Sequence, residues 1–280
     1  MHPETPERIV PPADSGRFAF GENWRDFVGQ LGESGIAEAR RGLEKLLPAG
    51  EIRGRRFLDL GCGSGLSMLA AMQLGAASVA GIDLDPNSIE AARTLLSRYS
   101  PGGPWTLRQA DLLSLAPQTE GIFDIVYSWG VLHHTGEMRT ALDRAAALVA
   151  PGGKLAVALY RRTPMCGFWA REKRLYAGAG PFAQAAIRVL YKAAFCAGLV
   201  ATGRSPRRYI REYVSARGMS WTHDVHDWLG GYPYESIGPA EVAAALDALG
   251  FSLVRSFTRP AVLGGLLGSH CDEFVAARRY

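Results

Sequence analysis

Short apolar segments alternate with longer helical segments along the first half of the sequence. The segments with the pattern of buried strands are 56–60, 78–83, 104–109, 123–128 and 154–160. Between them, LSMLAAMQL, PNSIEAARTLLSRY and MRTALDRAAALV carry apolar residues at helical spacing. Parallel strands need crossover connections of about this length, and a helix is the usual connection. The alternation therefore predicts an α/β fold, with a doubly wound, mostly parallel sheet that helices cover on both faces.

The alternation stops at Tyr160, and the second half of the chain is organised differently. Residues 161–220 carry irregular helical spacing, and a helix over 239–249 precedes strand-like segments at 251–257 and 272–279. The predicted parts are an N-terminal arm with helices (1–50), a core (51–160), a basic helical lid (161–238), and a last helix with a terminal β-hairpin (239–280). We expect the lid to be an insertion between the fifth and sixth strands.

The composition is that of a globular protein. With 280 residues, 48% of them hydrophobic and 21% charged, the chain has enough apolar material for a sizeable core. The four cysteines lie far apart and form no Cys-x-x-Cys pair, so we expect reduced thiols, no metal site and a cytoplasmic protein. No stretch reaches the roughly 18 uncharged apolar residues of a membrane-spanning helix, so no transmembrane segment is expected.

The basic residues are concentrated in the lid. Residues 160–220 contain twelve Arg and Lys but two Glu, although the net charge of the whole chain is only +4. Such a local excess indicates an anionic partner. We expect Arg207, Arg208 and Arg211 to bind an anionic small molecule. Two alternatives stay open: nucleic acid, whose phosphates the arginines would contact, and a membrane surface against an apolar helix at 181–200.

A glycine-rich loop follows the first buried strand. In FLDLGCGSGLS, residues 57–67, glycine stands at every second place: Gly61, Gly63 and Gly65. Such a loop presents bare backbone N–H groups at the start of a helix, which suits nucleotides. The spacing lacks the third glycine of a dinucleotide-binding loop, which disfavours NAD. Asp83 ends the next strand, where a carboxylate can accept hydrogen bonds from both hydroxyls of a ribose.

Residues 55–160 resemble the class I, seven-stranded S-adenosylmethionine-dependent methyltransferases, which have a Rossmann-like fold. Their first motif stands here as Phe57 to Gly65, so the resemblance implies that Asp59 orients the loop and the methionine amino group of the cofactor. The glycines, with Cys62 between them, would let the backbone approach S-adenosylmethionine. Asp83 matches the acid that holds the ribose, and Leu84 would lie beside the adenine.

Two later segments extend the same resemblance. QADLLSL, residues 109–115, resembles the third motif of the family, in which Asp111 would accept a hydrogen bond from the adenine amino group and Leu112 would donate one from its backbone. YSWGVLHH, residues 127–134, resembles the segment that lines the methionine end of the cofactor, which points to Ser128 and Trp129.

Four histidines are candidates for a general base. His133 and His134 stand where the acceptor would enter, although packing alone would also explain them. His223 and His226 belong to the run HDVHD, whose ligands do not share one helical face, so an acceptor-facing cluster is favoured over a metal site. The remaining residues expected to contact the acceptor are Trp24, Tyr160, Tyr232 and Tyr234.

The sequence therefore predicts a methyltransferase that uses S-adenosylmethionine and acts on a small molecule, most readily on oxygen. A looser resemblance, to quinone-methylase-like enzymes, agrees with a small acceptor. Methylation of nucleobases or glutamine is disfavoured, because the (D/N/S)-P-P-(Y/F) run is missing after the fourth strand. Two other functions remain open: an RNA methyltransferase or RNA binder that uses the basic lid, and a peripheral-membrane enzyme that methylates a lipid intermediate. The sequence does not indicate an oligomeric state.

Overall fold

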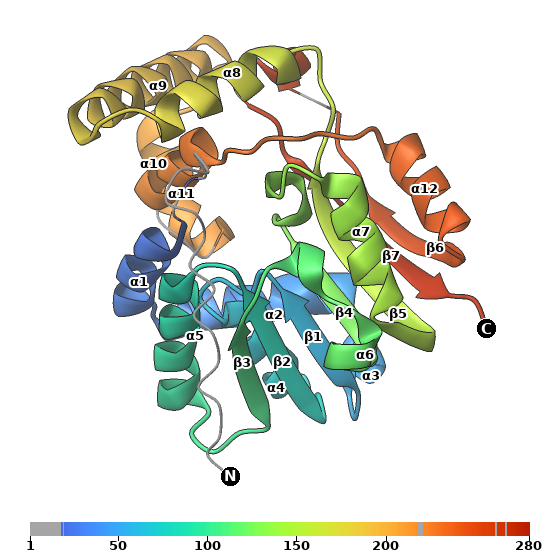
Figure 1. Cartoon of the computed structure of the whole chain (residues 1–280). Helices are drawn as coiled ribbons and strands as arrows, with labels where there is room; N and C mark the ends of the chain where they lie inside the picture. The colour runs from blue at the N-terminus through green and yellow to red at the C-terminus, as the bar shows by residue number, and fades with distance from the viewer. Residues whose placement is uncertain (1–17, 19, 218–220, 261, 267) are drawn as a thin grey trace.

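A seven-stranded sheet forms the centre of the protein, seen here in a computed structural model that describes residues 18, 20–217, 221–260, 262–266 and 268–280 (Figure 1). The strand order is β3-β2-β1-β4-β5-β7-β6, and β7 runs in the direction opposite to the other six strands. The strands are β1 (Arg56–Leu60), β2 (Ser78–Asp83), β3 (Trp105–Gln109), β4 (Phe123–Trp129), β5 (Val149–Tyr160), β6 (Phe251–Phe257) and β7 (Cys271–Arg278). The predicted fold class is confirmed, including the hairpin of β6 and β7 at one edge of the sheet.

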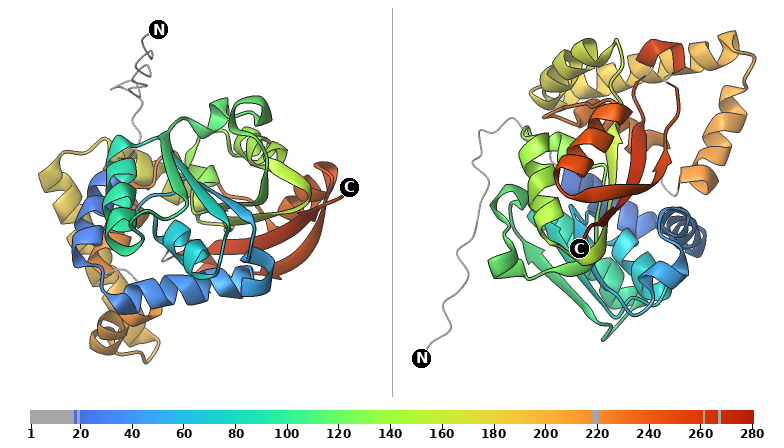
Figure 2. Two further views of the ribbon diagram at one scale, coloured as in Figure 1. Left: turned by 90° about the horizontal axis from the view of Figure 1, so that it is seen from below. Right: turned by 90° about the vertical axis from the view of Figure 1, so that its right-hand side faces the viewer.

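Helices cover both faces of the sheet (Figure 2, left). One face carries α2 (Glu33–Leu46), α4 (Leu66–Gln73) and α5 (Pro86–Tyr99), and the other carries α7 (Met138–Ala147) and α12 (Pro239–Ala248). Neighbouring side chains of a strand point to opposite faces. Accordingly, Phe57 is buried in the core on the first face, whereas Leu58 is buried in the core on the second. Four short helical segments belong to the core: α3 (Ala49–Ile52), α6 (Pro117–Glu120), η1 (Leu112–Ser114) and η2 (Leu132–His134). A fifth, η3 (Val262–Gly265), lies against α8 (Cys166–Ala177) of the lid at the top of the molecule (Figure 1).

The lid lies above the carboxyl ends of β4 and β5, where Figure 1 shows its helices stacked at the top of the molecule. It consists of α8 (Cys166–Ala177), α9 (Pro181–Ala201), α10 (Pro206–Arg217) and α11 (Trp221–Gly230). The N-terminal helix α1 (Phe20–Gln30) packs against α5 and contacts α11. It therefore connects the lid with the core.

The chain enters and leaves the lid at adjacent positions. Arg161 forms a parallel β-bridge with Ile237. The N–H of Ile237 donates to the carbonyl of Tyr160 over 3.0 Å, and the N–H of Arg162 donates to the carbonyl of Ile237 over 3.0 Å. Beside this junction, the Arg161 guanidinium pairs with Asp272 of β7 over 3.1 Å. Asp272 is almost completely buried, so this ion pair anchors the junction in the sheet.

One sequence expectation needs correction. Strand β5 begins at Val149 instead of 154, because Val149 already pairs with Phe123 across an irregularity in the ladder. A further finding concerns membrane-spanning segments. Among the described residues, α9 is long and apolar enough to cross a membrane by length and composition alone, with a mean hydropathy of 1.3 over an 18-residue window. Arg188 and Lys192 interrupt its apolar run, which is why a count of uncharged residues missed it.

Candidate active site

The glycine loop connects β1 to α4 next to the end of β2. The N–H groups of Gly61 and Cys62 both donate to the carbonyl of Ile82, over 2.7 and 3.1 Å. Gly61 has a φ of +75°, and a Cβ atom on it would overlap the side chain of Val131, which follows β4. Glycine is needed here for its backbone conformation and for the close approach of the two loops.

Two buried carboxylates lie beside this loop. The Asp83 carboxylate accepts hydrogen bonds from the N–H groups of Gly63 and Asp85, each over 2.9 Å. Burial, together with the nearby charge of Asp83, raises the pKa of Asp59 to about 8. Burial also raises the pKa of Asp83 to about 6, although its N–H partners oppose the shift. A cationic ligand beside these acids would therefore be bound favourably, because it would stabilise their ionised forms.

The residues expected at the adenine lie at the same edge of the sheet. Leu84 follows β2, and Asp111 follows the neighbouring strand β3. The side-chain amide of Gln109 donates to the carbonyl of Leu84 over 3.1 Å and so ties the two strand ends together. Asp111 accepts from the N–H of Leu113 over 2.9 Å, which starts the short helix η1 and buries Leu112.

The N-terminal helix covers the glycine loop. The indole of Trp24 lies 3.2 Å from the position that a Cβ atom on Gly63 would take, and it packs edge-on against Phe27. The N–H of Gly21 donates to the Asp85 carboxylate over 2.9 Å, which holds α1 to the start of α5. The structure thus places Trp24 on the loop predicted to bind the cofactor, although we expected it to contact the acceptor.

Ser128 and Trp129 end β4 and point to different partners. The hydroxyl of Ser128 is buried and donates to the carbonyl of Leu60 over 2.9 Å, which joins β4 to the end of β1. The indole of Trp129 is 45% exposed and donates to Glu273 of β7 over 3.0 Å. Trp129 is therefore bonded to the antiparallel part of the sheet, and Val131 is the residue of this segment that touches the glycine loop.

His133 and His134 lie under the lid on η2. Nδ1 of His133 accepts a hydrogen bond from the backbone N–H of Tyr160 over 3.2 Å. Nδ1 of His134 lies 2.7 Å from the carbonyl oxygen of Pro233 and donates to it, since a carbonyl can only accept. Burial lowers the pKa of His133 well below 6.5 and that of His134 to about 3. Both rings are therefore neutral at physiological pH.

A cluster of aromatic side chains around one lysine packs against Tyr160, whose ring also lies against that of His133. We call Trp169, Lys173, Trp228 and Tyr234 the lid cluster. Lys173 is fully buried; its ammonium donates to the carbonyl of Trp228 and lies 3.7 Å from the centre of that ring. The rings of Trp228 and Tyr234 lie 5.4 and 5.3 Å from that of Tyr160. Burial lowers the pKa of Lys173, because the apolar surroundings disfavour its charge.

Lys173, Trp169 and Trp228 are not among the site residues predicted from the sequence, where Lys173 counts only as one charge of a basic region. A signal was present: Trp169, Lys173 and Tyr176 are spaced four and three residues apart, so they share one face of α8. All three are buried. A lysine at the centre of an apolar helical face indicates an interior group, not a surface charge.

The second pair of histidines lies elsewhere in the lid. His226 packs edge-on against Phe18, and its Nδ1 lies 2.7 Å from the hydroxyl of Tyr176. Burial lowers its pKa, with a further contribution from Arg188. His223 lies one turn earlier on α11, and no group of three or more His, Cys, Asp or Glu arranged for a metal occurs in the described part of the chain. The structure thus joins His226 to α1, α8 and α9, and His133 to Tyr160 at the end of β5.

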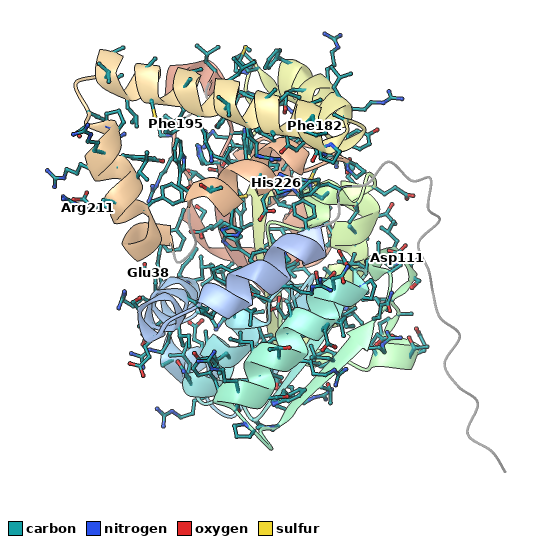
Figure 3. All side chains as sticks on the ribbon, turned by 90° about the vertical axis from the view of Figure 1, so that its left-hand side faces the viewer. Glu38, Asp111, Phe182, Phe195, Arg211 and His226 are labelled. Carbon is teal, nitrogen blue, oxygen red and sulfur yellow. The ribbon has the colours of Figure 1, made fainter. Side chains whose placement is uncertain are left out.

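The remaining predicted acceptor contacts are divided between the lid's interior and its exterior. Tyr234 belongs to the lid cluster, whereas the carbonyl of Tyr232 accepts from the N–H of Phe18 over 3.1 Å. Arg207, Arg208 and Arg211 are exposed on α10. Figure 3 shows Arg211 at the outer edge of the lid, pointing away from His226. The three arginines are therefore not gathered around the lid cluster.

A separate surface cavity of about 450 Å³ opens at the start of α7. Its lining includes Glu137, Arg139, Arg162 and Glu235. It shares no lining residue with the glycine loop or the lid cluster, so the candidate site does not depend on it.

Comparison with known families agrees with this geometry. Residues 58–157, which run from β1 to β5, match the family model described as a methyltransferase domain. The chain carries a methyltransferase domain. The matched segment contains the glycine loop, both buried acids and the two histidines of η2.

Curated relatives of this methyltransferase domain include enzymes named for two different substrates. The ubiquinone biosynthesis O-methyltransferase of Bordetella avium is 37% identical over 116 residues, which are 41% of this chain and 47% of the relative. The ribosomal protein L11 methyltransferase of Xanthomonas euvesicatoria pv. vesicatoria is 35% identical over 155 residues, 55% of this chain and 45% of the relative. The chain thus spans less than half the length of these relatives.

Solved structures share the fold over most of the chain. The magnesium protoporphyrin IX methyltransferase from Synechocystis PCC 6803, solved with bound S-adenosylhomocysteine, has a TM-score of 0.55 and 19% identity, with 92% of this chain and 93% of that one covered. An O-methyltransferase family protein from Burkholderia thailandensis has a TM-score of 0.53 and 16% identity, with coverage of 87% and 57%. At these identities the likeness establishes the fold of the methyltransferase domain.

Proposed function

We propose that the protein transfers a methyl group from S-adenosylmethionine to an oxygen of a small molecule held between the glycine loop and the lid cluster. The residues at the loop fit this cofactor. Asp59 and Asp83 are buried acids suited to its cationic methionine end and to its ribose, and Gly63 leaves open the space that a Cβ atom would fill below Trp24. When bound, the cofactor supplies an electrophilic methyl group.

The observation that carries the proposal is the set of buried polar groups around Tyr160. Among the described residues, Nε2 of His133 and Nε1 of Trp228 are buried and have no hydrogen-bond partner. Nδ1 of His133 is an acceptor, so Nε2 of the neutral ring bears the proton. Two unpaired N–H donors beside Tyr160 suit an acceptor molecule with oxygen atoms, because buried donors gain stability from a partner.

Lys173 supplies the group that takes the proton. The hydroxyl oxygen of the acceptor must lose a proton when it gains the methyl group. A buried amine with a lowered pKa is neutral in a larger fraction of molecules than an exposed lysine, so it can accept this proton. The rings of Trp228 and Tyr234 exclude water from the same space and favour a flat acceptor.

Larger substrates are the main competing class. Arg207 and Arg211 are exposed on α10 and would suit the phosphates of RNA. The curated relatives also include methyltransferases named for ribosomal protein L11. The buried lid cluster supports a small acceptor instead, because a macromolecule would have to thread a side chain or base beneath α8 and α11 to reach Lys173.

A methyl-transfer assay with labelled S-adenosylmethionine tests the proposal. The acceptors would be a panel of phenols and hydroxylated quinols, total RNA, and purified ribosomal proteins, with Gly63→Val as the negative control. We expect label only on small hydroxylated molecules, and none with Gly63→Val, since its side chain would collide with Trp24. Label on RNA or on protein alone would overturn the proposed acceptor class. Failure of the wild-type protein to bind S-adenosylhomocysteine in calorimetry would overturn the proposed cofactor.

A further inference from the structure

Helix α9 exposes a broad apolar face. All 21 of its residues are described, and every exposed one is apolar or proline. These residues form what we call the outer face of α9: Pro181, Phe182, Ala183, Ala185, Ala186, Val189, Leu190, Ala193, Ala194, Ala197, Val200 and Ala201. Phe182 is 93% exposed, Leu190 70% and Val189 66%. An apolar face of this length on a solvent-exposed helix indicates an interaction surface.

The polar residues of α9 point the opposite way and are bonded within the lid. The amide of Gln184 donates to the carbonyl of Tyr176 over 3.1 Å, and Arg188 donates to the Tyr176 hydroxyl over 2.7 Å. The ammonium of Lys192 donates to the hydroxyl of Thr222 on α11 over 3.1 Å. These bonds fix the rotation of the helix. Its outer face therefore stays directed away from the protein.

The orientation of α9 suits a flat partner. Figure 3 shows the helix lying across the top of the lid, with Phe195 below it on the side of the protein. Because Arg188 and Lys192 are bonded to the lid, the helix is positioned to lie along a surface, not to cross it. At 1.5 Å per residue, 21 residues give a strip about 30 Å long.

Basic residues flank the outer face. Arg171 and Arg174 are exposed on α8, which packs beside α9, and Arg204 is exposed just beyond its end. We call Arg171, Arg174 and Arg204 the basic rim. The exposed arginines of α10 lie outside it, because α10 runs away from α9 toward α2, and Figure 3 shows Arg211 well below α9. Two exposed apolar residues of α8, Phe168 and Leu175, add to the apolar surface of the lid.

We propose that the outer face of α9 docks in the plane of an anionic lipid bilayer, with the basic rim on the lipid headgroups. An apolar strip flanked by arginines has the pattern of an interfacial helix, in which apolar side chains enter the acyl region and cations bind anionic headgroups. A second copy of the chain fits less well, since an isologous contact would place the two basic rims against each other. This inference goes beyond methyl transfer and does not depend on the identity of the acceptor.

Vesicle flotation with the full chain tests the proposal. We expect the protein to float with vesicles of phosphatidylglycerol and phosphatidylcholine, to bind pure phosphatidylcholine vesicles more weakly, and to be released by added salt. The double variant Val189→Ser/Leu190→Ser should have a partition coefficient into anionic vesicles that is lower by about tenfold or more, because two exposed apolar side chains are lost from the contact.

A matched control uses exposed apolar residues elsewhere. Leu253→Ser/Val254→Ser changes two adjacent residues of β6, 44% and 45% exposed, and should bind vesicles like the wild type. Equal melting temperatures and equal affinity for S-adenosylhomocysteine would show that each variant is folded. Absence of flotation, or equal flotation of both double variants, would overturn the proposal. So would a dimer in sedimentation that Val189→Ser/Leu190→Ser abolishes, because the outer face would then bind a second copy.

Discussion

The backbone N–H of Tyr160 donates to Nδ1 of His133, and the rings of the two residues lie with their centroids 3.8 Å apart. Because Nδ1 is occupied as an acceptor, the proton of the neutral imidazole sits on Nε2. His133 can then donate a hydrogen bond to an acceptor molecule but has no free lone pair to take a proton. The geometry favours a binding role for His133 over the general-base role considered from the sequence.

We predict that His133→Ala lowers kcat/KM about 10- to 100-fold, the effect of one lost hydrogen bond in a buried site. The acid limb of the pH–rate profile should keep its midpoint, because burial already holds the pKa of His133 well below 6.5. Steady-state kinetics from pH 5 to 9 would measure both quantities. Disappearance of the acid limb in His133→Ala would instead identify His133 as the base.

Replacement of Lys173 should change the pH–rate profile, unlike replacement of His133. Lys173→Met keeps the apolar stem, but it removes the amine, and we expect kcat to fall about 10²- to 10⁴-fold with the acid limb lost. In the wild type, the rate should rise with pH as Lys173 loses its proton, with a midpoint well below 10.5. Arg174→Met, the exposed neighbour on α8, is the matched control and should leave the profile unchanged. A Lys173→Met enzyme with a near-native kcat would contradict the proposed proton transfer.

Asp83 should control cofactor affinity. Asp83→Ala removes a carboxylate that can accept hydrogen bonds from the ribose and that positions the N–H of Gly63. S-adenosylhomocysteine should therefore bind about 1.5–3 kcal/mol more weakly, which raises its Kd by about one to two orders of magnitude. Titration calorimetry would measure the change. Asp124→Ala is the matched control, since Asp124 accepts from the N–H of Arg56 at the opposite end of β1. Equal affinities for wild type and Asp83→Ala would contradict the assignment.

Asp59 should make the folded protein less stable as the pH rises. Its pKa is about 8 in the folded state against an ordinary 3.8, so between these values the folded state holds more protons than the unfolded state. The contribution of Asp59 to the free energy of unfolding should then fall as the pH rises from about 4 to 8. Urea denaturation at several pH values should show that the stability of the wild type relative to Asp59→Asn decreases over this range. Parallel curves for the two proteins would rule out the effect.

Trp24 should contribute to cofactor binding from outside the core. Since its indole lies over Gly63, Trp24→Ala should weaken binding of S-adenosylhomocysteine by about tenfold. Phe168→Ala, an exposed aromatic residue of the lid, should have no effect on that affinity. Calorimetry on both variants would measure this. If Trp24→Ala instead lowered only the affinity for the acceptor, Trp24 would belong to the acceptor site, as predicted from the sequence.

The core was predictable because its signals are local. The glycines of the loop, the acid at the end of β2 and the apolar runs of the strands each follow from a few neighbouring residues, and a parallel sheet brings them to one edge. The lid cluster was not predictable in the same way. Lys173 and Trp228 are 55 residues apart, and their contact depends on how α8 packs against α11. Trp129 likewise bonds to Glu273, a partner that only the position of β7 makes available.

The junction of Arg161 with Ile237 has a consequence for how such a chain can change over time. Since the excursion of about 75 residues starts and finishes at one β-bridge, its length and content can vary without moving any strand. The sheet keeps the cofactor loop while the inserted helices are replaced. An enzyme with a new acceptor, or with a new location in the cell, can then arise through replacement of this one segment.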